Sequence, residues 1–189
     1  MARTSVLFVQ GGGAGAYLED RPLAESLQRA LGAKYDVRFP RMPDEADPNV
    51  EAWKRQIAVE LSRLRGQVML VAHSIGGSIL LRYLSEEEVG KPIAGIFLLA
   101  APSWDEERWS YDDLRLPRDL AEKLAPIPRI YFYHCRDDEI VPFAHLGLHA
   151  ARLPGAITRA GDRGGHAFGN DLTAVALDLR GCDPGGGGG

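Results

Sequence analysis

The sequence predicts an α/β fold, a three-layer sandwich in which a mainly parallel, six-stranded sheet lies between two layers of helices. Short, continuously apolar runs such as residues 68–72 are typical of strands that are buried on both faces. These runs alternate with stretches that carry apolar residues at helical spacing, which indicates crossover units on a parallel sheet. With 189 residues, the chain is long enough to bury a sizeable core.

The expected elements follow this alternation along the chain. We predict strands at residues 5–10, 35–39, 67–72, 93–100, 129–134 and 156–159, in the spatial order 2-1-3-4-5-6. We predict helices at residues 22–31, 50–64, 75–84, 145–151 and 172–179. Leu23 and Leu27 lie on one face of the first helix, and Trp53 and Ile57 lie on one face of the second. We expect both faces to belong to the core.

The organisation of the chain indicates a single domain over residues 1–182. Its one long irregular segment, residues 101–128, contains Trp104 and Trp109. Loops of this length in a compact domain are usually functional or disordered, and the aromatic content favours a minimal cap beside a site. Both tryptophans are candidates for lining a substrate pocket, with anchoring of the cap to the core as the alternative. The glycine-rich tail, residues 183–189, is expected to be disordered.

The composition argues against several classes of function. A net charge of -4 without a basic cluster argues against a nucleic-acid partner. No apolar stretch approaches the ~20 residues that span a membrane. Two cysteines, Cys135 and Cys182, form no disulfide framework, so we expect a reduced, cytoplasmic location. The sequence does not indicate the oligomeric state, and we expect no cofactor.

A nucleophile is indicated by the pentapeptide Ala72-His73-Ser74-Ile75-Gly76, which stands between a predicted strand and a predicted helix. A serine on a sharp strand-to-helix turn is exposed for attack, and small flanking residues permit the turn. Ala72 replaces the first glycine of the G-x-S-x-G pattern. The alternative is that Ser74 only caps the helix, because serine is a favoured N-cap residue.

A serine hydroxyl needs a base, and the base needs an orienting carboxylate. Asp137 and Asp138 follow the fifth predicted strand, and His166 lies in a glycine-rich loop after the last one. Both places lie beyond carboxyl ends of strands, where open α/β sheets carry their chemistry. Asp162 competes with Asp137 and Asp138 for the role of the acid, and Asp138 could instead cap the turn that follows it.

These motifs together resemble the alpha/beta-hydrolase superfamily, in particular the small serine hydrolases related to the retinoblastoma-binding serine hydrolase. The similarity covers nearly all of residues 6–179. Residues 138–142, Asp-Glu-Ile-Val-Pro, resemble the family's D-x-x-V-P pattern, which selects Asp138, and Gly165-His166 resembles its G-H pattern. The resemblance implies a catalytic triad of Ser74, Asp138 and His166.

The resemblance also implies an oxyanion hole and a reaction. Its donors would be the backbone N–H groups of Ile75 and of one residue in the loop after the first strand, for which we choose Gly12. Gln10 stands where family members often have His-Gly. The expected reaction is hydrolysis of a small carboxylic ester through an acyl-enzyme intermediate. A binding protein that retains the fold without turnover is the alternative.

Two further sequence patterns are typical of other kinds of binding site. Residues 11–16 read as G-x-G-x-x-A after a strand, which could cradle a dinucleotide pyrophosphate. No acid follows the second strand to bind a ribose hydroxyl, but Arg41 at that place could suit a 2′-phosphate. His145 and His149 have the i, i+4 spacing of a metal pair. No third ligand is evident, so we expect no metal and place both histidines on an exposed helical face.

Overall fold

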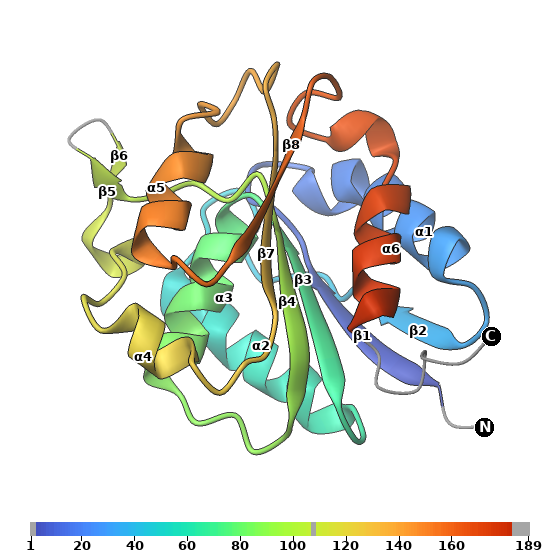
Figure 1. Ribbon diagram of the computed structural model, residues 1–189. Coiled ribbons are helices and arrows are strands. Elements are labelled where there is room, and N and C mark those ends of the chain that lie inside the picture. The colour runs from blue at the N-terminus through green and yellow to red at the C-terminus, as the bar shows by residue number, and fades with distance from the viewer. Residues whose placement is uncertain (1–2, 107–108, 183–189) are drawn as a thin grey trace.

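The computed structural model describes residues 3–106 and 109–182, and its centre is a six-stranded parallel sheet (Figure 1). The strand order β2-β1-β3-β4-β7-β8 confirms the predicted order 2-1-3-4-5-6. All neighbouring pairs in this sheet are parallel. The strands are β1 (Thr4–Val9), β2 (Tyr35–Arg38), β3 (Val68–His73), β4 (Ile93–Leu99), β7 (Ile130–Cys135) and β8 (Ile157–Gly161).

Helices cover both faces of the sheet, as the three-layer prediction requires. The helices α1 (Ala16–Leu31) and α6 (Thr173–Gly181) lie on one face (Figure 1). The opposite face carries α2 (Val50–Arg63), α3 (Ile75–Glu86), α4 (Leu120–Leu124) and α5 (His145–Arg152). Two short 3-10 helices, η1 (Asp112–Leu114) and η2 (Phe168–Asn170), lie in connections. Within the described ranges, none of the helices has the length and apolarity that crossing a membrane requires.

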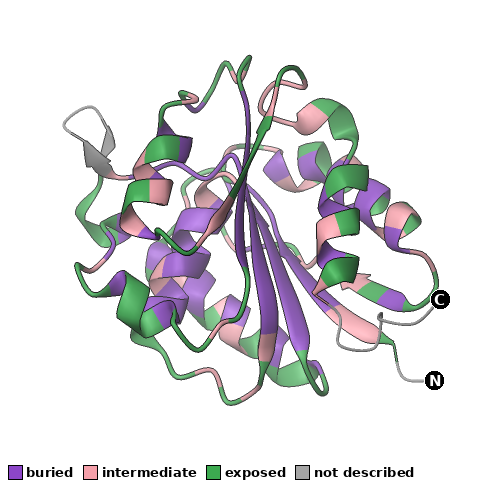
Figure 2. Ribbon diagram, in the orientation of Figure 1, coloured by how far each residue is buried: buried purple, intermediate pink, exposed green. Residues whose placement is uncertain are grey.

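The core consists of two apolar clusters, one on each face of the sheet. Trp53 and Ile57 belong to the cluster under α2 and α3, and Leu23 and Leu27 belong to the cluster under α1 and α6, which confirms both predicted faces. Every residue of β3 is buried, so its continuous apolar run is explained by contact on both sides (Figure 2). At one edge, the three central residues of β8 are exposed.

The first helix begins six residues earlier than predicted, at Ala16, and contains Pro22. A proline removes one helical hydrogen bond, here the bond to the carbonyl of Leu18. Leu18 is exposed, so water can reach that carbonyl. The start of the helix is stabilised by Glu45, whose carboxylate accepts a hydrogen bond from the Tyr17 N–H at 2.8 Å. The helix start therefore depends on a partner 28 residues away.

The described parts of the irregular segment 101–128 pack beside α3 and α5. The segment contains a two-stranded hairpin, β5 (Asp105–Glu106) and β6 (Trp109–Ser110), followed by η1 and α4. Leu114 and Leu120 are buried in the same core cluster as α3, and Arg152 of α5 donates hydrogen bonds to the carbonyls of Leu116 and Pro117. The predicted tail, residues 183–189, lies outside the described residues.

The first turn of α3 lies against the end of β1 with no room for a side chain. A Cβ atom added to Gly76 would lie 2.0 Å from the carbonyl oxygen of Gln10. A Cβ added to Gly77 would lie 2.9 Å from the Cβ of Ala101. Glycine therefore permits α3 to start directly above the carboxyl edge of the central strands.

We predict that Gly76→Ala lowers the free energy of unfolding by about 1–3 kcal/mol or more, because backbone must move to admit the methyl group. The matched control is Gly147→Ala in α5, where an added Cβ meets nothing within 4 Å. This control should raise stability by about 0.5–1 kcal/mol, since alanine is the better helix former. Urea unfolding of both variants measures the difference, and equal effects would contradict the close approach.

Candidate active site

Ser74 lies on the sharp turn between β3 and α3, with φ 53° and ψ −132°. A residue other than glycine at positive φ is strained by about 1–3 kcal/mol and persists only where surrounding structure holds it. The Ser74 side chain makes no capping hydrogen bond to α3, so the helix-cap alternative does not explain this serine. The residue is partly exposed at the carboxyl edge of the sheet. The turn thus leaves Ser74 partly accessible to solvent.

His166 and Asp138 are in direct contact. Nδ1 of His166 lies 2.9 Å from Oδ2 and 3.1 Å from Oδ1 of Asp138. The two other candidate acids are placed differently. Asp137 accepts hydrogen bonds from the N–H groups of Gly164 and Gly165, and the almost fully exposed Asp162 faces Arg136 at 3.5 Å. Of the three carboxylates, Asp138 is the one that binds the imidazole.

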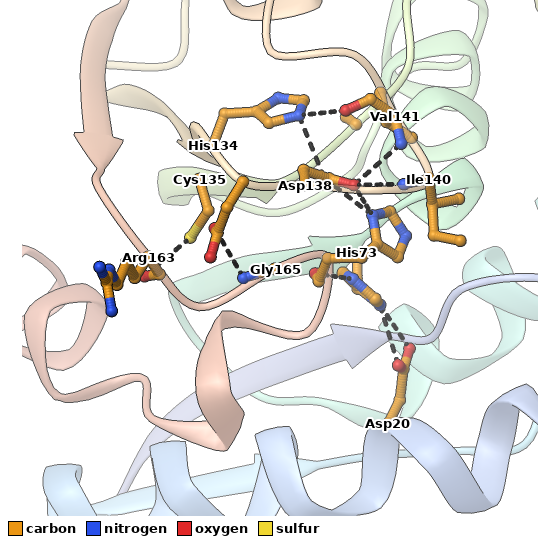
Figure 3. Close-up of polar contacts among 12 residues, drawn as sticks. Asp20, His73, His134, Cys135, Asp138, Ile140, Val141, Arg163 and Gly165 are labelled. Atoms are coloured by element: carbon orange, nitrogen blue, oxygen red, sulfur yellow. Dashed lines mark hydrogen bonds and ion pairs between the residues drawn. The ribbon is translucent and has the colours of Figure 1, made fainter.

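Asp138 is held in its ionised form although its side chain is fully buried. Burial alone would raise the pKa of Asp138, but hydrogen bonds from His134, His166 and the N–H groups of Ile140 and Val141 outweigh it and hold the pKa well below its usual range. The distances are 3.1 Å from His134 Nε2 and 2.9 Å from each of the two N–H groups (Figure 3). Asp138 thus caps its own turn and binds His166 at the same time.

His166 lies next to the serine turn through His73, the residue before Ser74. His73 Nε2 donates a hydrogen bond to the backbone carbonyl oxygen of His166 at 3.0 Å. The centres of the two imidazole rings are 4.7 Å apart. The fold therefore brings together a serine, a histidine and a carboxylate that lie on three separate loops at one edge of the sheet.

The glycine loop after β1 lies against the residue that follows Ser74. A Cβ added to Gly12 would lie 2.8 Å from Cγ2 of Ile75, and Gly12 itself is exposed. The flanking N–H groups are engaged, since Gly11 donates to Asp20 Oδ2 at 2.6 Å and Gly13 donates to the Glu45 carbonyl at 2.6 Å. Neither of these bonds uses the N–H of Gly12.

Gln10 and Glu45 stabilise the glycine loop after β1 through hydrogen bonds. Gln10 is fully buried, donates a hydrogen bond to Glu45 Oε2 at 2.9 Å and accepts one from the Met42 N–H at 2.9 Å. Hydrogen bonds from Arg41 and Gln10 lower the pKa of Glu45 to about 2. Gln10 therefore serves a structural purpose at the position where the family often has His-Gly.

The same contacts argue against the dinucleotide alternative. A pyrophosphate would bind at the N-terminus of α1, but the carboxylate of Glu45 accepts the Tyr17 N–H there. The side chain of Pro48 lies under Gly12, because a Cβ added to that glycine would lie 2.7 Å from Pro48 Cγ. A carboxylate at the helix start and a proline side chain against Gly12 both disfavour a phosphate group at this place.

The expected exposure of His145 and His149 is wrong, because α5 packs this face against the sheet. The two residues are buried, and His149 stacks on Phe132 with ring centres 4.5 Å apart. His149 donates to the Ala101 carbonyl, and His145 accepts from the Ser103 N–H. Burial lowers the pKa of His149 to about 4. Among the described residues, no three histidine, cysteine or acidic side chains are grouped to hold a metal ion.

The two predicted pocket residues lie in the segment 101–128. Trp104 is partly buried against the core cluster under α3, and its ring lies 6.2 Å from that of Tyr111 in an edge-on arrangement. This contact fits the anchoring alternative for Trp104. Trp109 belongs to β6, but its side chain lies outside the described residues. A substrate-lining role for either residue stays a prediction.

Comparison with known proteins agrees with this geometry. The family model described as Serine hydrolase matches residues 23–170. The chain belongs to the serine hydrolase family. Its sequence is 27% identical over 159 residues to the YdeN protein of Bacillus subtilis (strain 168). The aligned region covers 79% of this chain and 75% of YdeN. The chain is thus a serine hydrolase with an α/β fold, and the alternative of a binding protein without turnover loses its support.

Solved structures show the same fold. The crystal structure of the ydeN gene product from B. subtilis has a TM-score of 0.71 at 20% identity and covers 96% of this chain and 98% of its own. The serine hydrolase CCSP0084 from Cycloclasticus zankles has a TM-score of 0.73 at 15% identity, with coverages of 94% and 88%. The esterase domain of a Rhodothermus marinus protein has a TM-score of 0.64 at 15% identity, with coverages of 95% and 86%.

Sequence reasoning missed three polar residues of this serine hydrolase: Asp20, Glu45 and His134. The spacing of Asp20 could have indicated its burial, because it precedes Leu23 and Leu27 by three and seven positions and so lies on the apolar face of α1. His134 precedes Asp138 by four positions at the end of a strand. Glu45 lies in an irregular connection, where no spacing reveals its partners.

We predict that Glu45→Gln destabilises the serine hydrolase in a pH-dependent manner. Because the pKa of Glu45 is lowered in the folded state, its contribution to stability is complete above its ordinary value of 4.5 and is lost as pH falls toward 2. The difference in free energy of unfolding between wild type and variant should therefore shrink as the pH of urea titrations falls from 7 to 3. The control is Glu25→Gln, because Glu25 is exposed on α1. A difference in free energy of unfolding between wild type and Glu45→Gln that does not change with pH would contradict the prediction.

Proposed function

We propose that the protein hydrolyses small carboxylic esters through an acyl-enzyme intermediate, with Ser74 as nucleophile, His166 as general base and acid, and Asp138 as the orienting acid. The observation that carries this proposal is the His166–Asp138 contact beside the strained serine turn. Membership of the serine hydrolase family supports the hydrolytic reaction. Ester bonds are the favoured substrate class because a related fold is that of an esterase domain.

Each residue has a defined step in this proposal. His166 Nε2 takes the Ser74 proton as the serine oxygen bonds to the acyl carbon and the carbonyl electrons move to its oxygen. When the tetrahedral intermediate collapses, the alcohol leaves with that proton, and the acyl group stays on Ser74. A water molecule then attacks the carbonyl of the acyl-enzyme and gives a proton to His166. When this second tetrahedral intermediate collapses, the bond between the acyl carbon and the Ser74 oxygen breaks, His166 returns the proton to Ser74, and the carboxylic acid leaves. Asp138 holds Nδ1–H throughout and stabilises the imidazolium.

The negative oxygen of the intermediate needs donors that are in place before the reaction. The proposed donors are the backbone N–H groups of Ile75 and Gly12. Ile75 is the first residue of α3, so its N–H is one of the groups that a helix leaves without an internal partner. Gly12 supports the proposal by its contact with Ile75 and its exposure.

We predict that a fluorophosphonate probe labels the wild-type protein and does not label Ser74→Ala. Hydrolysis of p-nitrophenyl acetate should show a burst followed by steady turnover, and both Ser74→Ala and His166→Ala should lower kcat/KM by about 10⁴-fold or more. The matched control is Ser62→Ala, which removes an exposed serine on α2. Labelling that persists in Ser74→Ala would contradict the proposal. A parallel panel of thioesters and anilides would show which class of acyl bond the enzyme cleaves.

The assignment of the acid makes a separate prediction. Asp138→Asn should lower kcat by about 10⁴-fold, because the amide cannot stabilise the imidazolium and favours the wrong tautomer. Asp162→Asn should retain wild-type kcat, since its side chain is 95% exposed and faces Arg136. Steady-state ester hydrolysis by both purified variants tests the choice, and a larger loss in Asp162→Asn would reverse it.

A further inference from the structure

A second histidine–carboxylate pair lies directly behind the proposed triad. His73 precedes Ser74 at the end of β3, and Asp20 lies on α1. Nδ1 of His73 is 2.9 Å from both carboxylate oxygens of Asp20 (Figure 3). The side chains are only 5% and 6% exposed. Neither side chain takes part in the steps proposed above.

The hydrogen-bond partners of His73 favour a ring that is protonated on both nitrogens. Its Nε2 faces the carbonyl oxygen of His166 at 3.0 Å, and a carbonyl can only accept, so Nε2 bears a proton. Its Nδ1 faces a carboxylate, and because imidazole is the stronger base of the two, the proton between them resides on the ring. A ring with protons on both nitrogens is an imidazolium, whose charge Asp20 balances.

The electrostatics of the site agree with this reading. Burial alone would lower the pKa of His73, but the hydrogen bond and the charge of Asp20 outweigh it and raise the pKa above its usual value. The His166 carbonyl and the charge of Asp138 act in the same direction. Buried charges are stable when they are paired and hydrogen-bonded, as they are in this pair.

Asp20 has a further partner in the glycine loop. Its Oδ2 accepts a hydrogen bond from the Gly11 N–H at 2.6 Å. Gly11 also lies against the nucleophile, since a Cβ added to it would be 3.3 Å from the Cβ of Ser74. One carboxylate thus contacts both the loop that carries Gly12 and the side chain next to Ser74.

We propose that Asp20 and His73 form a buried ion pair that positions the glycine loop, the serine turn and the backbone of His166 relative to one another. This inference rests on the proposed function, because it assigns the pair to the same site. The hydrogen bond from His73 goes to the backbone carbonyl of His166, so the imidazole ring of His166 remains free to bind Asp138. Both members are positioning residues.

The backbone of the His166 loop is permissive, so contacts such as those of Asp137 and His73 fix its position. Gly164 and Gly165 precede His166 with φ 135° and 59°, conformations that glycine adopts at no steric cost. Reacting groups that are misplaced by about 1 Å lose on the order of 10²-fold in rate. Loss of the ion pair should therefore lower kcat, with little change in KM.

The variant Asp20→Asn tests the pair. It keeps the shape of the side chain and an oxygen for the Gly11 N–H, and it removes the charge. We expect kcat for p-nitrophenyl acetate to fall by about 10–100-fold while KM changes little. The matched control is Glu86→Gln, which breaks the ion pair of Glu86 with the buried Lys54 at 2.6 Å. Glu86 ends α3, away from the catalytic edge, so the control should keep its kcat.

A spectroscopic measurement on the unmodified wild type tests the ion pair without using activity. Nitrogen-15 NMR of labelled histidine rings should show both ring nitrogens of His73 protonated at neutral pH, with the signals assigned by their loss in His73→Gln. This measurement also decides the case in which Asp20→Asn does not fold.

The outcomes separate this inference from the proposed function. A lower kcat in Asp20→Asn, an unchanged control and a doubly protonated His73 would support it. An Asp20→Asn enzyme with wild-type kcat, or a His73 ring with an unprotonated nitrogen at neutral pH, would overturn it. A wild type that neither reacts with the fluorophosphonate nor cleaves esters would instead count against the proposed function, and the NMR spectrum would still decide whether the ion pair exists.

Discussion

The close approach of α3 to the end of β1 is the contact on which the rest of the site depends. Gly76 lies so near the carbonyl of Gln10 that no side chain fits between them. Because the two segments are in van der Waals contact, the strained turn at Ser74 is held above the sheet, and the glycine loop is held beside Ile75. The strain at Ser74 persists because the two central strands, β1 and β3, carry both sides of this contact.

Buried charge is the second organising principle. Three carboxylates below the catalytic edge, Asp20, Asp138 and Glu45, each accept at least one backbone N–H group together with a side-chain donor. A carboxylate that is held in this way orders loops that would otherwise cost conformational entropy. The loops around the candidate site are therefore organised by buried carboxylates as well as by close packing.

The sequence was sufficient for the sheet and its order, because these depend on local patterns. The proposed triad stays a prediction, and its acid, Asp138, was selected by the family resemblance. An apolar run such as residues 68–72 shows its double burial directly, and Ser74 stands where such a run meets a helix. The start of α1 and the burial of His145 and His149 were not predictable in this way. Both depend on partners distant in the chain, Glu45 for α1 and the face of β7 for α5.

The exposed edge strand β8 has a consequence for how activity is lost. It pairs with β7 alone, and the chain that leaves it carries His166. Edge strands with exposed residues and a single neighbour open at lower free energy than central strands do. A local opening of β8 would remove His166 from Asp138 while the two core clusters stay intact. Inactivation by heat or denaturant should thus begin as a sub-global event, with the His166 loop detaching before the domain unfolds.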